Sequence, residues 1–282
     1  MQRWRPRRIQ LSTEWGEPLQ GGHWPGATLR LTVPFRETLE TAFRQMCGPR
    51  TAAFHANGEG IWVLELKGGQ TGARRLSQAR HWLETVGRYV AVRDWLDQCF
   101  ALDYDRALGQ GDSFRTEVGQ LRFRAKPLSD RATPAVRAAA ELLVERCLGF
   151  LGEMGSYAGA EAVAAAPPAK RGRPWHLPQF LARRIAAERG LEDLSGAIRT
   201  VRDRPSTKYR PLAEKLRNIT GSVEIDAPAF RHRRVLLIDD IYQSGTTLNY
   251  VAKLLYDAGA PAVYGLICEK TSRDDDNTAP KG

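Results

Sequence analysis

Short apolar runs alternate with stretches of helical spacing through the second half of the chain. Short runs rich in Val, Ile and Ala indicate buried strands, and apolar positions three or four residues apart indicate amphipathic helices. Strands that alternate with helices predict right-handed crossovers and a parallel sheet covered by helices on both faces. The expected strands are 160–166, 223–225, 235–238 and 262–268, and the expected helices are 134–149, 176–189 and 247–258.

The first part of the chain has a different pattern, with strand-like segments at 27–33 and 60–66 and a long helical stretch from about 72 to 100. This pattern predicts an α+β unit. A chain of 282 residues is long enough for two domains, each with its own core. We therefore expect an N-terminal α+β domain over 1–128, which forms a hood over a ligand or binds a partner, an α/β domain over 129–275, and a disordered tail at 276–282.

The charge of the chain favours anionic ligands, because 42 Lys and Arg outnumber 32 Asp and Glu and leave a net charge of +10. Aromatic side chains mixed with arginines between Trp62 and Phe100 suit a nucleic-acid clamp. We favour core packing with a solvated basic face there, since the segment contains no named nucleic-acid module. The arginine-rich residues 1–8 fit a solvated tail better than a phosphate-binding arm. Nucleic acid stays open as a partner.

Neither a membrane segment nor a cysteine framework is expected. No apolar run approaches the roughly 18 to 20 residues of a membrane span, and the first residues lack the apolar core of a signal peptide, so we expect a cytoplasmic protein with no membrane partner. The four cysteines contain no Cys-x-x-Cys pair, which argues against a zinc ribbon or a disulfide framework and favours isolated buried thiols. They are Cys47, Cys99, Cys147 and Cys268.

The most informative segment is 235–248, Val-Leu-Leu-Ile-Asp-Asp-Ile-Tyr-Gln-Ser-Gly-Thr-Thr-Leu, which joins a strand to two carboxylates and then to a turn that opens a helix. The turn can direct backbone N–H groups and hydroxyls at a phosphate, with the positive end of the helix dipole behind them. Asp239 and Asp240 suit the vicinal hydroxyls of a ribose and can order water around Mg²⁺. The segment therefore predicts a sugar-phosphate site, whose phosphate-binding residues are Gln243, Ser244, Gly245, Thr246 and Thr247.

This segment resembles the motif with which type I phosphoribosyltransferases bind 5-phosphoribosyl 1-pyrophosphate (PRPP). A Walker A motif is excluded because no Gly-Lys-Ser/Thr follows the glycine, and a dinucleotide fingerprint is excluded because its further glycines are missing. The resemblance covers about residues 130–272 and implies the type I fold, a parallel sheet with helices on both faces. It also implies transfer from PRPP to a nucleobase-like acceptor, with Mg²⁺ as cofactor. The Mg²⁺ would be carried by PRPP and reach Asp239 and Asp240 through water, with no direct protein ligand.

The turn after the strand at 160–166 resembles in position the pyrophosphate loop of these enzymes. Its candidate pyrophosphate-binding residues are Pro168, Ala169, Lys170 and Arg171. A pyrophosphate leaving group needs cations and oriented amides around it, which this loop can supply. The alternative is an ordinary exposed basic loop.

Residues 200–225 resemble the part of ComF-like phosphoribosyltransferases where an arginine–asparagine pair precedes a glycine and a short strand. In the type I family a mobile loop here closes over the donor, which implies a catalytic role for Lys208 or Arg210 at the pyrophosphate. A surface charge is the alternative at both positions. For His176 we favour a capping or packing role over that of a general acid.

The order of the two regions resembles the phosphoribosyltransferase toxins of bacterial anti-phage toxin–antitoxin modules, whose antitoxin is DprA-like. That resemblance implies a toxin that perturbs purine or other nucleotide metabolism and a DprA-like partner protein. The chain lacks the zinc ribbon of ComF-like proteins, and a base-selecting hood would have to come from residues 1–130 or be absent. Two alternatives stay open: a housekeeping salvage or competence-related enzyme, and a PRPP-sensing nucleic-acid-binding regulator without turnover. We also expect a homo-oligomer.

Overall fold

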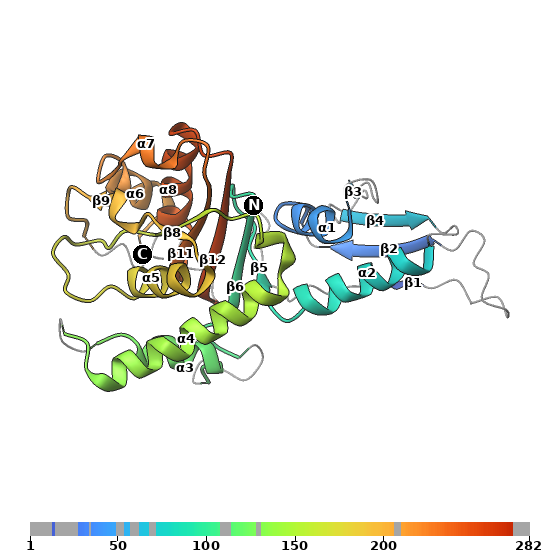
Figure 1. The fold of residues 1–282 in the computed structure, drawn as a ribbon, viewed down its shortest axis with the longest axis horizontal. Coiled ribbons are helices and arrows are strands. Elements are labelled where there is room, and N and C mark those ends of the chain that lie inside the picture. Colours follow the sequence, from blue (N-terminus) through green and yellow to red (C-terminus); the bar gives the residue numbers. More distant parts are fainter. Residues whose placement is uncertain are drawn as a thin grey trace.

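A six-stranded, mostly parallel sheet forms the centre of the computed structural model (Figure 1). The structure describes residues 13–14, 28–33, 35–48, 54–56, 62–67, 72–107, 114–127, 131–205 and 210–272. All neighbouring strands run parallel except the edge pair β5–β6, which is antiparallel. In spatial order the strands are β5 (Val90–Ala91), β6 (Gln98–Tyr104), β12 (Ala262–Lys270), β11 (Arg234–Tyr242), β7 (Ala162–Ala165) and β8 (Glu192–Asp193).

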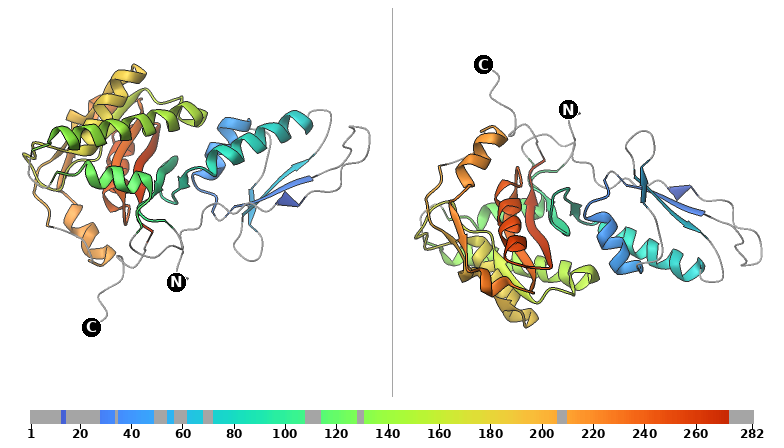
Figure 2. Two further views of the ribbon diagram at one scale, coloured as in Figure 1. Left: turned by 90° about the horizontal axis from the view of Figure 1, so that it is seen from below. Right: turned by 90° about the horizontal axis from the view of Figure 1, so that it is seen from above.

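Helices cover both faces of this sheet, which confirms the predicted α/β architecture. Successive side chains of a strand point to opposite faces. Leu236 and Ile238 accordingly pack in a core with α4 and α5, whereas Val235 and Leu237 pack in a second core with α8. The two views in Figure 2 look onto these opposite faces. The helices on the first face are α3 (Glu117–Arg124), α4 (Pro134–Glu153) and α5 (Leu177–Arg189), and those on the second are α6 (Leu212–Ile219), α7 (Ala227–Phe230) and α8 (Thr246–Asp257).

The N-terminal part forms a separate antiparallel sheet of four strands in the order β1-β2-β4-β3, with two helices beside it (Figure 1). Phe43 and Trp82, from the two helices, meet edge to face with ring centroids 5.1 Å apart. Both rings belong to the core that also contains α4, so α1 and α2 share their apolar packing with the larger sheet. The elements are β1 (Thr13–Glu14), β2 (Thr28–Val33), α1 (Leu39–Cys47), β3 (Phe54–Ala56), β4 (Trp62–Lys67) and α2 (Gly72–Val86).

The predicted helix over 72–100 is wrong in its second half. Helix α2 ends at Val86, and β5 and β6 follow it. Strand β6 exists because it pairs with β12, which is more than 150 residues away along the chain and invisible to local periodicity. Since β5 and β6 are two of the six strands, the large sheet extends across the predicted boundary between residues 128 and 129.

A smaller correction concerns 223–225. This segment is a strand, β10 (Val223–Ile225), but it pairs antiparallel with β9 (Ile198–Thr200) in a separate two-stranded sheet. The other predicted strands and helices are confirmed within a few residues at each end. Two short 3₁₀ helices, Gly155–Tyr157 and Ser195–Ala197, complete the described elements.

The cysteines are buried as predicted, but they are not all isolated. All four are buried thiols, and Cys268 interacts with Cys147. The aromatic residues differ in their burial. Trp82 and Phe100 lie in the core, as we favoured, but Trp95 is 82 % exposed. No helix among the described residues has both the length and the apolar composition that a membrane crossing requires. The predicted tail at 276–282 lies outside the described residues.

Candidate active site

A cavity of about 530 Å³ lies where β7 and β11 end at their carboxyl termini. Its walls come from five parts of the chain: the end of α3, the loop after β7, the beginning of α5, residues 204–205 together with α6, and the segment 239–248. Ligands of open parallel sheets bind at this edge of the sheet. The segment that carries the sequence motif therefore lies in the position expected of a binding site.

Asp239 and Asp240 both line the cavity but belong to β11 itself, which extends four residues beyond the predicted strand end. Strand alternation sends their side chains toward opposite faces of the sheet. The backbone N–H of Asp240 donates a 2.8 Å hydrogen bond to Oδ1 of Asp239. The two carboxylates thus have different surroundings although they are adjacent in sequence.

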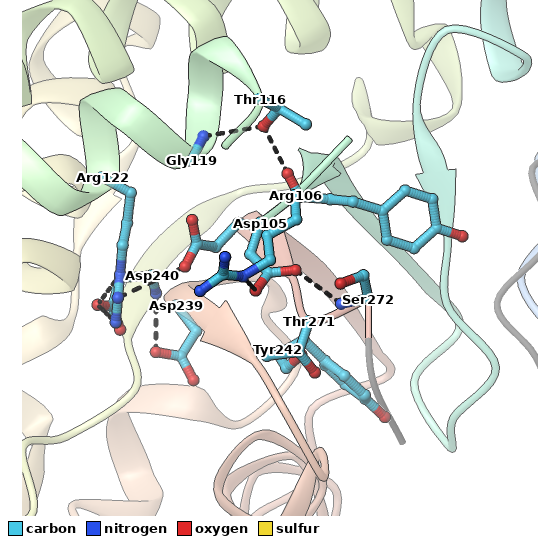
Figure 3. Close-up of polar contacts among 12 residues, drawn as sticks. Asp105, Arg106, Thr116, Gly119, Arg122, Asp239, Asp240, Tyr242, Thr271 and Ser272 are labelled. Carbon is cyan, nitrogen blue, oxygen red and sulfur yellow. Dashed lines mark hydrogen bonds and ion pairs between the residues drawn. The ribbon is translucent and has the colours of Figure 1, made fainter. Parts of the chain in front are cut away.

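Asp240 is held by Arg122 from α3 (Figure 3). Nε and Nη2 of Arg122 donate hydrogen bonds of 3.0 and 2.8 Å to Oδ2 of Asp240, and Nη1 lies 3.4 Å from Oε1 of Glu269 on β12. Glu269 is almost fully buried. One guanidinium therefore joins two carboxylates on neighbouring strands. Sequence reasoning missed Arg122, because nothing near it indicates a contact 118 residues away.

These contacts separate the pKa values of the two aspartates. Burial opposes ionisation of Asp240, but the charge and hydrogen bonds of Arg122 outweigh burial and hold the pKa of Asp240 below its usual value. Burial, together with the negative charge of Asp240, raises the pKa of Asp239 well above its usual value. Burial also raises the pKa of Glu269 to about 7. Asp240 is therefore the anionic member of the pair, and Asp239 binds a proton more readily.

The predicted phosphate-binding loop forms a tight turn into α8. Gly245 has φ +69°, and a Cβ at this position would collide with the Tyr242 hydroxyl and ring. Nδ2 of Asn249 donates a 3.0 Å hydrogen bond to the carbonyl oxygen of Gly245, and the hydroxyls of Ser244 and Thr246 lie 2.8 Å apart. A glycine is required here both for the left-handed backbone and for the close approach. All five predicted residues, 243–247, line the cavity, with the first turn of α8 beside them.

Arg204 joins this loop to the loop after β7. Its Nη2 donates to the carbonyl oxygens of Pro167 and Pro168 at 3.1 and 3.0 Å, and its Nη1 lies 3.5 Å from Oγ1 of Thr247. The residue is 8 % exposed and lines the cavity. Within the part of the chain that the structure describes, no carboxylate forms an ion pair with Arg204 and its Nε has no hydrogen-bond partner. The sequence offers no signal that separates Arg204 from the exposed Arg202.

The predicted pyrophosphate-binding residues divide into two groups. Pro168 and Ala169 line the cavity. Lys170 and Arg171 are exposed and do not line it, and Arg171 instead donates from its backbone N and from Nε to Oδ1 of Asp203, both at 3.0 Å. Arg173, two residues further along, lines the cavity.

The structure describes one of the two candidates for a mobile-loop cation, and that residue does not line the cavity. Lys208 lies outside the described residues. Arg210 is exposed, and its Nη1 lies 3.5 Å from Oε1 of Glu214 in the first turn of α6. Of the arginine–asparagine pair, Asn218 lines the cavity, while Arg217 is exposed.

His176 lies at the N-cap of α5 and lines the cavity, but its side chain caps no backbone N–H. Its Nδ1 is buried and has no hydrogen-bond partner among the described residues. Burial lowers the pKa of His176 to about 4, although the negative charge of Asp240 acts in the opposite direction. The neighbouring Trp175 donates from Nε1 to the carbonyl oxygen of Ala125 at 3.1 Å, which ties the start of α5 to the end of α3.

The cavity as a whole suits a phosphorylated ligand with hydroxyl groups. Five cationic side chains line it, against the two carboxylates of Asp239 and Asp240. Those carboxylates offer only oxygen atoms, which fits Mg²⁺ better than a softer metal. No group of three or more His, Cys, Asp or Glu side chains among the described residues is arranged to hold a metal ion directly. The cationic residues are Arg122, Lys126, Arg173, Arg204 and Lys215.

Comparison of the sequence with models of known protein families gives no match, and no curated protein matches it.

Proposed function

We propose that the protein is a Mg²⁺-dependent phosphoribosyltransferase of the type I fold that uses PRPP. The observation that carries this proposal is the meeting of three elements around one cavity. Asp239 and Asp240 suit a ribose diol, the turn at 243–247 suits a 5-phosphate, and the loop at 167–169 with Arg204 suits a pyrophosphate. PRPP contains these three groups in one molecule.

In the proposed reaction, the bond between C1 of the ribose and the pyrophosphate oxygen breaks, and the pyrophosphate leaves with the electron pair. A nitrogen of the nucleobase-like acceptor forms the new bond to C1, and its proton is released to water. Mg²⁺ bound with PRPP would offset the charge of the departing pyrophosphate. The protein's contribution is positioning and electrostatic stabilisation, because the ribose becomes cationic while the leaving group becomes more anionic.

The buried Arg204 gives this proposal its electrostatic support. Burial lowers the pKa of Arg204 and the negative charge of Asp239 offsets this only in part, so a further anion in the cavity would stabilise the guanidinium. Arg204 already contacts both anion-binding loops through Pro168 and Thr247. A pyrophosphate between these loops would supply the missing negative charge.

The test is mass-spectrometric product analysis with PRPP, Mg²⁺ and a panel of nucleobases. The wild-type protein should consume PRPP and release pyrophosphate, and the Asp239→Asn/Asp240→Asn variant should not. Asp257→Asn is the matched control, because Asp257 is an exposed carboxylate at the end of α8 that pairs only with Lys253 among the described residues. Full turnover by the double variant would refute the assignment of the site. PRPP binding without any product would favour a PRPP-sensing regulator, and ribose 5-phosphate as the product would identify water as the acceptor.

For the cellular role we propose a toxin that perturbs nucleotide metabolism and is restrained by a DprA-like partner. The support is architectural: a distinct N-terminal sheet precedes a domain with the proposed transferase site. Induced expression of the wild type should arrest bacterial growth, whereas the Asp239→Asn/Asp240→Asn variant at equal protein level should not. Normal growth with an active enzyme would favour a housekeeping transferase.

A further inference from the structure

Arg122 contacts one of the two proposed ribose-binding carboxylates, Asp240, from an element outside the sequence motif. Its side chain is only 14 % exposed, and two of its nitrogen atoms donate to the same oxygen, Oδ2 of Asp240. Two charge-assisted hydrogen bonds to one oxygen hold that oxygen in a defined position beside the guanidinium. The second oxygen, Oδ1, accepts neither of these two hydrogen bonds.

Hydrogen bonds fix the helix that carries Arg122 at both ends, and Figure 3 shows those at its start. At its start, Oγ1 of Thr116 accepts a 3.0 Å hydrogen bond from the N–H of Gly119 and donates to the carbonyl oxygen of Tyr104, at the end of β6. Gly119 packs so tightly that a Cβ there would collide with the carbonyl oxygen of Asp105. Beyond its end, Ala125 accepts the hydrogen bond from Trp175. Arg122 thus approaches Asp240 from a rigid support.

Glu269 fixes the guanidinium from its other side. It lies on β12 opposite Ile241 of β11, and its Oε1 is 3.4 Å from Nη1 of Arg122. Removing one member of a buried ionic network leaves an uncompensated charge, so the three groups are expected to act as a unit. Among the described residues, the charged or titratable groups facing Asp240 are Arg122 from α3, His176 from the start of α5, Asp239 from its own strand, and Cys268 and Glu269 from β12.

We propose that Arg122 is a positioning residue for phosphoribosyl transfer: it holds the Asp240 carboxylate in one orientation, so that Oδ1 accepts a hydrogen bond from a ribose hydroxyl of PRPP. The inference rests on the function proposed above and assigns Arg122 no contact with the substrate. It explains why a buried arginine from a distant helix is directed at the second aspartate of the motif.

The experiment compares Arg122→Gln, Arg122→Lys and the control Arg124→Gln, an equivalent change at an exposed arginine on the same helix. PRPP affinity is measured by calorimetry with Mg²⁺, and turnover is split into kcat and KM. Arg122→Gln should raise the Kd for PRPP by about 10- to 100-fold, the range of a hydrogen bond to a charged group. Arg122→Lys should recover part of this loss, because it keeps the charge but not the two-donor geometry. Arg124→Gln should bind as the wild type does.

A double-variant cycle separates positioning from a structural role. If Arg122 acts through Asp240, Arg122→Gln should weaken PRPP binding by less than about 3-fold when Asp240 is already Asn. Equal effects in both backgrounds, or wild-type affinity in Arg122→Gln, would overturn the inference. Should Arg122→Gln not fold, Arg122→Lys serves in the same cycle. Failure of the wild type to bind PRPP would instead overturn the proposed function, so the two failures are distinguishable.

Discussion

Replacing Arg204 with glutamine is expected to weaken PRPP binding strongly while changing stability little. The guanidinium is 8 % exposed, contacts both loops proposed to bind the anionic groups of PRPP, and forms no ion pair within the described part of the chain. The variant removes the positive charge but keeps a side-chain amide that can donate to one of the carbonyl oxygens. The affinity for PRPP therefore reports the loss of the positive charge, whereas the stability reports the partial loss of the hydrogen bonds to the carbonyl oxygens.

The magnitudes follow from the surroundings of the side chain. A unit charge about 4 Å from an anion contributes about 4 kcal/mol at an effective dielectric constant of about 20. Because the neighbouring Arg173 and Lys215 compensate in part, the loss of binding free energy for PRPP should be about 2–4 kcal/mol, which corresponds to a rise in Kd of about 30- to 1,000-fold. Hydrogen bonds from Arg204 to Pro167 and Pro168 are lost in part, but the desolvation cost of an unpaired buried cation disappears as well. The free energy of unfolding should then change by less than about 2 kcal/mol.

The assay is calorimetric titration with PRPP and Mg²⁺, combined with denaturant unfolding of the same samples. Arg202→Gln is the matched control, since Arg202 also donates to backbone carbonyl oxygens, those of Asn218 and Thr220, but is exposed. Equal PRPP affinities of Arg204→Gln and Arg202→Gln would refute the assignment of a pyrophosphate cation to Arg204. A large loss of stability with unchanged affinity would mean that the residue only joins the two loops.

Two further predictions test the turn and the buried histidine. Gly245→Ala should abolish PRPP binding and lower the unfolding free energy by more than about 1 kcal/mol, because φ is +69° and the new Cβ collides with Tyr242. The control is Gly196→Ala, whose new Cβ meets no neighbouring atom. A Gly245→Ala protein with normal PRPP affinity would contradict the proposed turn. The pKa of His176 is about 4, below its unfolded value of about 6.5, so the unfolded state binds the proton first as the pH falls. Between pH 7 and 4.5 the unfolding free energy of the wild type should therefore fall by about 2 kcal/mol more than that of His176→Gln, as measured by denaturant unfolding. Parallel pH profiles of the two proteins would show that His176 is not buried as described.

Much of the second half of the fold was predictable because its signals are local. The run 235–238, the glycine at 245 and the helical spacing after it are read within a few turns of chain, and the structure has a strand, a turn with positive φ and a helix there. The predicted helix over 72–100 failed at β6, which exists only through pairing with β12. Local periodicity cannot register such pairing.

By itself, the sequence determined the α/β order of elements, the strand–turn–helix at 235–258 and the chemical types of the groups in that turn. Only the tertiary structure decided which other side chains complete the site. It brought in Arg122 and Arg204 and left Lys170 and Arg171 outside the cavity wall. The physical reason is that the position of a charged side chain depends on partners distant in sequence. Arg122 donates to Asp240, which is 118 residues away in the sequence, and Arg171 donates to Asp203, which is 32 residues away.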